Sequence, residues 1–531
     1  MNRIFKWTML CFCTLSIMIG CGKKEKDDEF VKADDLMKEA VEIELSDEKI
    51  LVNGVEIAKD ESADVYMAND IVYYEEGKDF TYGEGTKEDE HSKEDADKHT
   101  VVHISKTGTY ALSGELSYGQ IAVDLGDDAK EDETAVVNLI LNGVDINCDV
   151  APAVIFYNVY ECGSDEAEGA SKDVDTSKAG ANVYIADGTE NHVTGSYVAK
   201  IYKSYELSED GTEVIDSKKL HKYDAAFYSK RTMTVNGGSK GTGILNILAD
   251  NEGLDSELHL TINGGNINIE SGNDGINTNE DEVSVTTVNG GTLNILVNGS
   301  TGEGDGIDSN GWLVINGGTV IAQACSDSGD AGIDSDMGIH INGGTVIATG
   351  NMLDRISESK ATYAVFTFAE RQKGSNTYSL KNSSGEVVFE LDNTNAFTYL
   401  ILAGDKLTEG DYTLWCNDKQ CEGSSMGSFG MGRPDGGRGD GAGFEDGKMP
   451  RPEDGVIFEG MENSEIPEDM KKPDKGERLE DMELPEKGER PDGMERPENM
   501  EMGPMQTGGE RTEIFTIVKG TNQFFNITEK D

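Results

Sequence analysis

A short phrase repeats five times between residues 232 and 350, and each copy has Val or Ile followed by Asn-Gly-Gly. The repeated asparagines follow one another at intervals of 27, 26, 27 and 26 residues: Asn236, Asn263, Asn289, Asn316 and Asn342. A fixed period of this size is typical of proteins built from stacked structural repeats. This feature constrains the fold more than any other, because each repeat must bury its apolar side against its neighbours.

Four copies of the phrase lead into runs of alternating apolar and polar residues, which indicate half-buried β-strands. The runs cover residues 266–269, 292–295, 319–322 and 345–348. A second corner recurs in each period, with sequences such as Asp305-Gly306-Ile307-Asp308. Two glycine corners and short strands in each period do not fit a helical repeat. The sequence therefore predicts an all-β chain, with a right-handed parallel β-helix over residues 43–355.

Acidic residues gather at the second corner, whereas residues 241–354 contain no Lys or Arg. Stacked carboxylates repel one another unless a cation or a proton offsets their charge. A donor set made of oxygen atoms suits Ca²⁺. The predicted calcium ligands are Asp274, Asp305, Asp308, Asp330 and Asp334. The alternative is that these side chains only form the corners, by accepting hydrogen bonds from nearby backbone N–H groups.

Two aromatic residues are candidates for stacking on a sugar ring. Trp312 directly follows the corner 308–311, and Tyr228 lies just before the first repeat. Each has an alternative role: Trp312 can pack a strand against a loop, and Tyr228 can belong to the core.

The chain after residue 355 changes character. Aromatic-rich runs predict a small C-terminal β domain over residues 356–421. Residues 422–510 consist mostly of Gly, Met, Pro, Glu and Asp, a composition that cannot bury a core and predicts a disordered insertion. Strand-like sequence resumes at residues 511–531, which are expected to be the final strands of the same C-terminal domain.

The N-terminus indicates export. Arg3 and Lys6 precede an apolar run that is too short to remain as a transmembrane helix, so residues 1–20 are predicted to be a signal peptide. The end of this run resembles a bacterial lipobox, with Cys21 as the lipidated residue and residues 21–42 as a charged tether. An ordinary signal peptide with an incidental cysteine is the alternative. The expected location is outside the cytoplasm, surface exposed and lipid-anchored to the cell membrane.

The net charge narrows the choice of partners. The chain has 102 acidic and 46 basic residues and a formal net charge of −56. Such a charge argues against nucleic acid or an anionic membrane surface as the ligand.

Several phrases together resemble the bacterial family of β-helix domains that bind calcium and polysaccharide and share their fold with pectate lyases. The matching segments are 108–114, 139–146, 151–155 and 188–191, together with the Asn-Gly-Gly and Asp-Gly-Ile corners. The resemblance implies non-catalytic binding of a polysaccharide such as cellulose or polygalacturonate, with Ca²⁺ in the β-helix. The chain departs from the family pattern in polar insertions at 87–98, 127–134 and 162–180.

Two other functions stay open. A calcium-dependent polysaccharide lyase needs a basic side chain near the proton that it removes, and only Lys230, Arg231, Lys240 or Arg355 flank the regular repeats. The other is a structural or adhesive surface lipoprotein without a sugar ligand.

Overall fold

The computed structural model describes residues 33–425 and 511–530, all within one compact unit. The predicted signal peptide, Cys21 and nearly all of the predicted disordered insertion lie outside the described residues. The predicted all-β class is confirmed. The described helices are short: α1 (Ala33–Leu36), α2 (Lys93–Ala96) and the 3-10 turns η1 (Met37–Glu39) and η2 (Asp127–Glu131). None of the helices in these residues is long and apolar enough to cross a membrane.

A first group of strands pairs in parallel from one repeat to the next, and we call it the first stack. Its strands are β1 (Val41–Leu45), β6 (Gly108–Leu116), β8 (Val137–Cys148), β10 (Ala181–Ile185), β15 (Met233–Gly237), β18 (His259–Ile262), β21 (Val285–Val288), β23 (Trp312–Ile315) and β25 (Gly338–Ile341). The residue before each Asn-Gly-Gly points inward and is at most 1% exposed: Val235, Ile262, Val288, Ile315 and Ile341.

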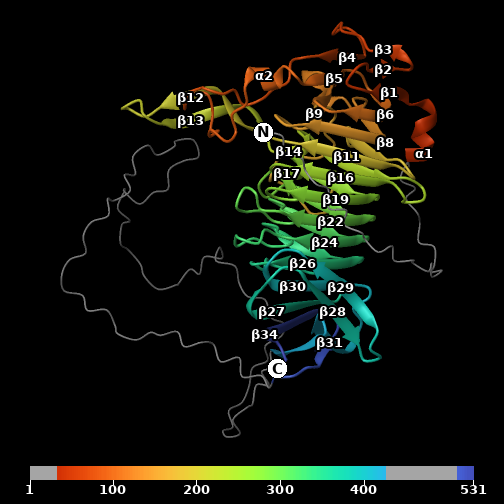
Figure 1. The fold of residues 1–531 in the computed structure, drawn as a ribbon, viewed down its shortest axis with the longest axis vertical. Helices are drawn as coiled ribbons and strands as arrows, with labels where there is room; N and C mark the ends of the chain where they lie inside the picture. Colours follow the sequence, from red (N-terminus) through yellow and green to blue (C-terminus); the bar gives the residue numbers. More distant parts are fainter. Residues whose placement is uncertain (1–32, 426–510, 531) are drawn as a thin grey trace, which may run out of the picture. The chain divides into compact units, whose positions relative to one another are not determined.

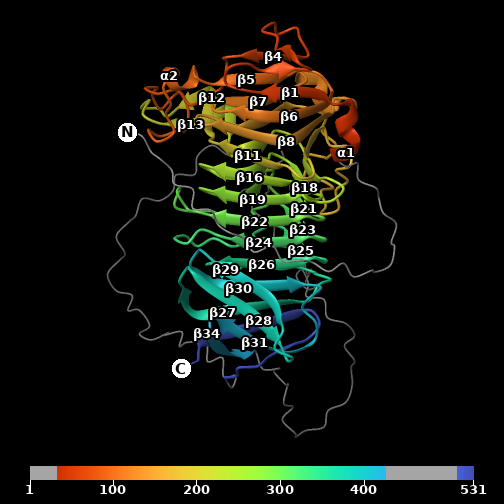
Figure 2. The ribbon, with the colours of Figure 1, turned by 45° about the vertical axis from the view of Figure 1, so that its right-hand side comes forward.

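The alternating runs form a second stack, also parallel. It begins on the C-terminal half of β8 and continues through β11 (Glu190–Gly195), β16 (Ile244–Ala249), β19 (Asn266–Ser271), β22 (Thr292–Val297), β24 (Thr319–Gln323) and β26 (Thr345–Gly350). Figure 1 shows these strands lying one above another, and Figure 2 shows strands of the first stack beside them. Apolar residues face inward at every second position, as the pattern predicts.

A third stack carries the second corners. It consists of β5 (Thr100–Ile104), β7 (Gly119–Asp124), β9 (Val154–Asn158), β14 (Ala225–Ser229), β17 (Glu252–Ser256) and β20 (Ile276–Thr278). A parallel bridge from Ile276 to Ile307 extends the pairing into the next repeat. The chain visits the three stacks in turn, and their inward side chains form one continuous core.

The first corner is held by a ladder of side-chain amides. Asn263, Asn289, Asn316 and Asn342 each donate a hydrogen bond from Nδ2 to Oδ1 of the preceding repeat's asparagine, at 2.8 to 2.9 Å. The second glycine of the phrase has positive φ in four copies, for example +84° at Gly291, which favours glycine. The ladder fixes the register of successive repeats.

A two-stranded antiparallel hairpin follows β11 and was not expected from the sequence. It consists of β12 (Val198–Leu207) and β13 (Val214–Tyr223), and its pairing contains several bulges. Three further strands pair antiparallel near the N-terminal end: β2 (Leu51–Val52), β3 (Val55–Glu56) and β4 (Val65–Ala68). Strand β13 ends two residues before β14 of the third stack, so Lys219 and Lys222 of β13 lie near that stack.

The C-terminal strands form a separate core against the last repeat. They are β27 (Tyr363–Gln372), β28 (Asn376–Asn382), β29 (Val387–Asn393), β30 (Phe397–Gly404), β31 (Gly410–Cys416), β32 (Lys419–Ser425), β33 (Phe515–Ile517) and β34 (Thr521–Glu529). Strand β30 pairs antiparallel with β26, and β34 pairs parallel with β27. Residues on both sides of the segment 426–510 thus contribute to one sheet.

Candidate functional site

The second corner of each repeat places acidic side chains in two rows. Four corners share one pattern: 252–256, 274–278, 305–309 and 331–335. Position two is Gly, position three is a fully buried Leu or Ile, and positions one and four are mostly acidic. Position two must be glycine because the next repeat passes very close: a Cβ on Gly306 would lie 2.3 Å from the carbonyl oxygen of Gly332.

Three of the predicted calcium ligands converge. Carboxylate oxygens of Asp305, Asp308 and Asp334 all lie within 4.8 Å of one another, a spacing suited to a shared cation. Two of these residues occupy position four of successive corners, and Asp305 occupies position one. We call this group the lower cluster.

The electrostatics of the lower cluster favour a bound cation. Burial and the neighbouring Asp274 carboxylate raise the pKa of Asp305 to about 9. Burial and Asp334 raise the pKa of Asp308 to about 7, and burial and Asp354 raise that of Asp334 to about 6. Within residues 33–425 and 511–530, no Lys or Arg forms an ion pair with any of the three. The donors are all oxygen, as Ca²⁺ requires.

The other two predicted ligands take part differently. Asp274 is 9% exposed and accepts a hydrogen bond from the Asp305 backbone N–H at 2.7 Å, so it ties two repeats together as well as adding charge. Asp330 accepts the Gly304 N–H at 2.6 Å and the Ser328 hydroxyl, which is corner chemistry. Asp330 is not part of the converging group.

The two aromatic candidates differ in their exposure to solvent. Trp312 begins β23, four residues after Asp308. It is partly exposed, and its carbonyl oxygen accepts a hydrogen bond from Ser309 Oγ at 3.0 Å. Tyr228 is 1% exposed, and its hydroxyl donates to Glu257 Oε1 at 2.5 Å. The expectation that Tyr228 stacks on a sugar is therefore corrected, because a ring packed in the core offers no face to a ligand.

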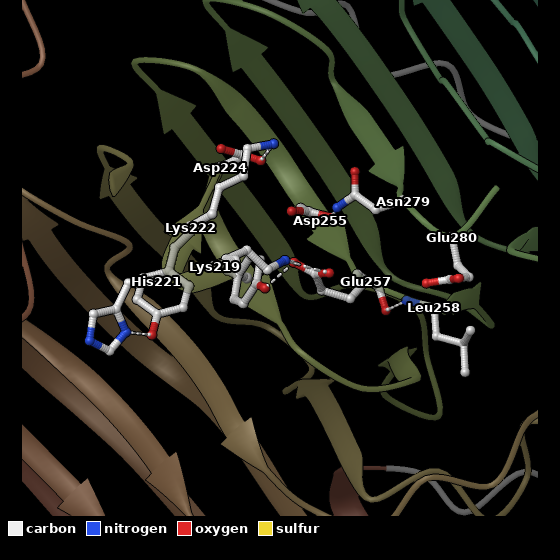
Figure 3. A network of polar contacts seen from close by, with 12 residues as sticks. Lys219, His221, Lys222, Asp224, Asp255, Glu257, Leu258, Asn279 and Glu280 are labelled. Carbon is white, nitrogen blue, oxygen red and sulfur yellow. Dashed lines mark hydrogen bonds and ion pairs between the residues drawn. The ribbon is translucent and has the colours of Figure 1, made fainter. Parts of the chain in front are cut away.

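A second group of acidic residues lies nearer the N-terminal end of the third stack. None of its members is among the predicted calcium ligands. Lys222 Nζ lies 2.5 Å from Asp224 Oδ2, and Lys219 lies 3.0 Å from Glu257 Oε1 (Figure 3). Two further buried acids, Glu252 and Asp255, occupy positions one and four of the first corner, and both interact electrostatically with Asp224 and Lys222. Aligning that corner with the other three would have found both residues.

The geometry defines the class: an all-β chain of stacked parallel strands with oxygen-rich acidic rows along one side. The profile of the carbohydrate-binding domain-containing protein family matches residues 98–398, which is 301 of 531 residues. The chain belongs to this family.

Individual relatives match over limited lengths or at low similarity. A carbohydrate-binding domain-containing protein of Acetivibrio thermocellus is 31% identical over 172 residues, which is 32% of this chain and 45% of the relative. The chain thus matches less than half of that relative's length. A solved structure described as a polysaccharide lyase-like protein from C. thermocellum, in a gadolinium derivative, is 21% identical. The match covers 60% of this chain and 97% of that one, with a TM-score of 0.33.

Proposed function

We propose that this protein binds polysaccharide without cleaving it, at the cell surface and with the help of Ca²⁺ in the lower cluster. The observation that carries the proposal is the convergence of Asp305, Asp308 and Asp334, in a chain of a carbohydrate-binding family. We further propose that the three stacks are the faces of a right-handed parallel β-helix. The one-repeat register of all three stacks supports this.

The proposed ligand is a glycan such as polygalacturonate or cellulose. A calcium ion held by three carboxylates on one side keeps coordination positions that uronate oxygens can fill. Trp312, partly exposed and four residues after Asp308 in the sequence, supplies an aromatic face for a neighbouring sugar ring. Removing calcium would then weaken binding of an acidic glycan more than binding of a neutral one.

The arrangement of basic residues favours binding over catalysis. Arg355 Nη2 donates to the Met337 carbonyl oxygen at 3.0 Å. Lys230 and Lys240 are exposed and Arg231 is partly exposed, and in the described part of the chain none of the three forms an ion pair with the lower cluster. Burial alone would lower the pKa of Lys222, but Asp224 and other acids raise it overall, so this lysine is a poor proton acceptor. A lyase would need a neutral base close to the bound glycan.

A titration tests the proposal. In isothermal titration calorimetry of the chain after residue 20, Asp308→Asn should weaken calcium binding at least tenfold and abolish the calcium-dependent part of polygalacturonate binding. Asp327→Asn is the matched control, because its carboxylate has a side-chain exposure of 90% and lies outside the cluster. Glycan binding unchanged by EDTA and by Asp308→Asn would reject the calcium role. Unsaturated product from polygalacturonate would establish a lyase instead.

The surface location has its own test. Lipidation at Cys21, which lies outside the described residues, would hold the protein at the membrane. We expect Cys21→Ala to release the protein into the culture medium, as measured by immunoblotting of membrane and medium fractions. A Cys13→Ala variant, changed within the predicted signal peptide, should stay membrane-bound. Equal fractionation of the Cys21→Ala variant and the wild type would contradict the anchor.

A further inference from the structure

We propose that Glu252, Asp255 and Asn277 form a second, buried binding site for a divalent cation, at two successive corners of the third stack. The observation is that one oxygen of each side chain, Glu252 Oε2, Asp255 Oδ2 and Asn277 Oδ1, is buried and has no hydrogen-bond partner among the residues that the structure describes. The three residues are 5%, 0% and 8% exposed. Leaving such groups unpaired in the interior is unfavourable, so a further group must satisfy them.

The backbone brings the three residues together. Asp255 of β17 lies directly opposite Asn277 of β20 in the parallel register. Nδ2 of Asn277 donates to Glu252 Oε1 at 3.1 Å, and Nδ2 of Asn279 donates to Asp255 Oδ1 at 2.8 Å. The two amides thus use one oxygen of each carboxyl group and leave the other one. Asn277 Nδ2 also donates to Asn279 Oδ1 at 3.0 Å. Both bonds of Asn277 therefore use its nitrogen, and its Oδ1 stays without a donor from the described residues.

The charges of this group do not balance without a cation. Three buried carboxyl groups, Asp224, Glu252 and Asp255, have one nearby ammonium, Lys222, which is bonded to Asp224. If all three carboxyl groups are ionised, the group carries a net charge of −2. Lys219 does not correct this, because it pairs with Glu257. The imbalance matches one divalent cation or two protons, and burial together with the neighbouring acids raises the pKa of Glu252 well above its usual range.

The donor set identifies the kind of ion. Two carboxylate oxygens and one amide carbonyl oxygen are hard ligands, and no sulfur or imidazole belongs to the group. Ca²⁺ fits this set, with water or backbone oxygens completing its coordination. The site is separate from the lower cluster, and its three residues are at most 8% exposed and belong to two successive repeats, so its role is to hold these repeats of the third stack together rather than to meet a glycan. It does not rest on the proposed function.

Calcium counting tests the site. Equilibrium dialysis of the full chain against calcium, followed by elemental analysis, should show one fewer bound ion for Glu252→Gln and for Asp255→Asn than for the wild type. Asp308→Asn should lose a different ion, so that Asp255→Asn combined with Asp308→Asn loses two. Asp327→Asn should lose none. Far-ultraviolet circular dichroism would confirm that each variant is folded.

Stability in EDTA separates the cation from the protons. If the cation binds, Glu252→Gln should lose most of the wild type's gain in Tm on adding calcium. An unchanged calcium count, with Glu252→Gln more stable than the wild type in EDTA and its calcium gain intact, would show that the carboxyls hold protons instead and would overturn the proposal. If a variant does not fold, terbium binding by the wild type decides. Tyrosine-sensitised terbium luminescence should be weaker in Tyr228→Phe than in the wild type, because Tyr228 is the cross-strand neighbour of Asp255. Equal luminescence from the two proteins would also overturn the proposal.

Discussion

At the scale of single residues, some carboxylates at the corners have two roles, one for each oxygen. Asp274 and Asp305 each accept a hydrogen bond from a backbone N–H of the following repeat, at 2.7 and 2.5 Å. Asp305 is also a member of the lower cluster, and the Asp274 carboxylate adds charge beside it. These two contacts combine corner chemistry with a charge that a cation can offset. The two interpretations of the acidic corners are therefore compatible, because one carboxylate has two oxygens.

His99 gives the clearest dependence of stability on pH. Its ring is 0% exposed, with Nε2 2.8 Å from Asp149 Oδ1. Burial alone would lower the pKa of His99, but hydrogen bonds to Asp149 and Cys148 raise it to about 10. The folded-state pKa lies above the unfolded value of about 6.5, so the pair's contribution is full below pH 6.5 and is lost as pH rises toward 10.

The expected result is a pH-dependent difference between wild type and His99→Gln. Urea unfolding should show the variant less stable by about 1–3 kcal/mol near pH 6, since a buried partner is lost, and the difference should shrink toward pH 10. His103→Gln is the control, because that ring also pairs with an aspartate, Asp70, but is partly exposed. A difference between wild type and His99→Gln that stays constant from pH 6 to pH 10 would contradict the assignment.

At the scale of elements, the asparagine ladder joins the repeats of the first stack. Asn289 both donates to Asn263 and accepts from Asn316, whereas Asn342 at the end donates to Asn316. An interior member of the ladder therefore makes two amide bonds to its neighbours, and the last member makes one with the preceding repeat. The ladder should stabilise the stack in proportion to the bonds that each member makes.

We expect Asn289→Ala to lower the free energy of unfolding by about 1–3 kcal/mol, at about 0.5–1.5 kcal/mol for each bond lost. Asn342→Ala should cost about half as much, and so serves as the matched control. Chemical denaturation of both variants measures the ratio. Equal losses would mean that the asparagines act through their own turns and not through the ladder.

The elements differ in how far the sequence predicted them. The Asn-Gly-Gly phrases and their alternating runs fix strand positions and register, because a period of two and a constant spacing leave one arrangement with a buried apolar face. The hairpin at 198–223 has no such pattern: its exposed positions mix Lys, Tyr, Leu and Ile, and bulges interrupt its pairing. Sequence spacing therefore could not place it over the third stack.

The candidate site was predictable to the same degree. Asp305, Asp308 and Asp334 follow from the repeated corner, and so would Glu252 and Asp255. The core alternative for Tyr228 holds, but the sequence did not show which side chains cover the ring: they are Glu257 and Tyr223, the latter supplied by β13. Contacts between distant segments decide which of several similar side chains remain available to a ligand.

At the scale of the whole molecule, the last repeat is closed by the C-terminal sheet. Asn395 is 8% exposed and donates from Nδ2 to the carbonyl oxygens of Val297 and Ala324, at 2.6 and 2.7 Å. Its neighbour Thr394 donates its backbone N–H to Gln323 Oε1 at 2.8 Å. The bonds from Asn395 give a donor to backbone carbonyls in two consecutive repeats, so one side chain of the C-terminal sheet joins both repeats.

Removing that contact should loosen the sheet from the repeats. We expect Asn395→Ala to lower Tm by several degrees, because two buried carbonyls lose their donor, and to raise amide hydrogen exchange in β24 and β26. Asn376→Ala, at a partly exposed position in the same sheet, is the control and should leave exchange in those strands unchanged. Uniform exchange across both variants would show that the sheet is held by its apolar contacts alone.

The constant register of the stacks limits how such a chain can change in evolution. An insertion or deletion of one whole period keeps every amide of the ladder and every acidic row in line. An odd number of extra residues inside a strand turns its buried side chains outward, and an even number shifts the ladder and the acidic rows out of line. Extra residues are therefore confined to the corners, where the long excursions of this chain, 162–180 and 198–223, are found. A gene of this kind grows in steps of about 26 codons, and each step adds one more place to the acidic rows.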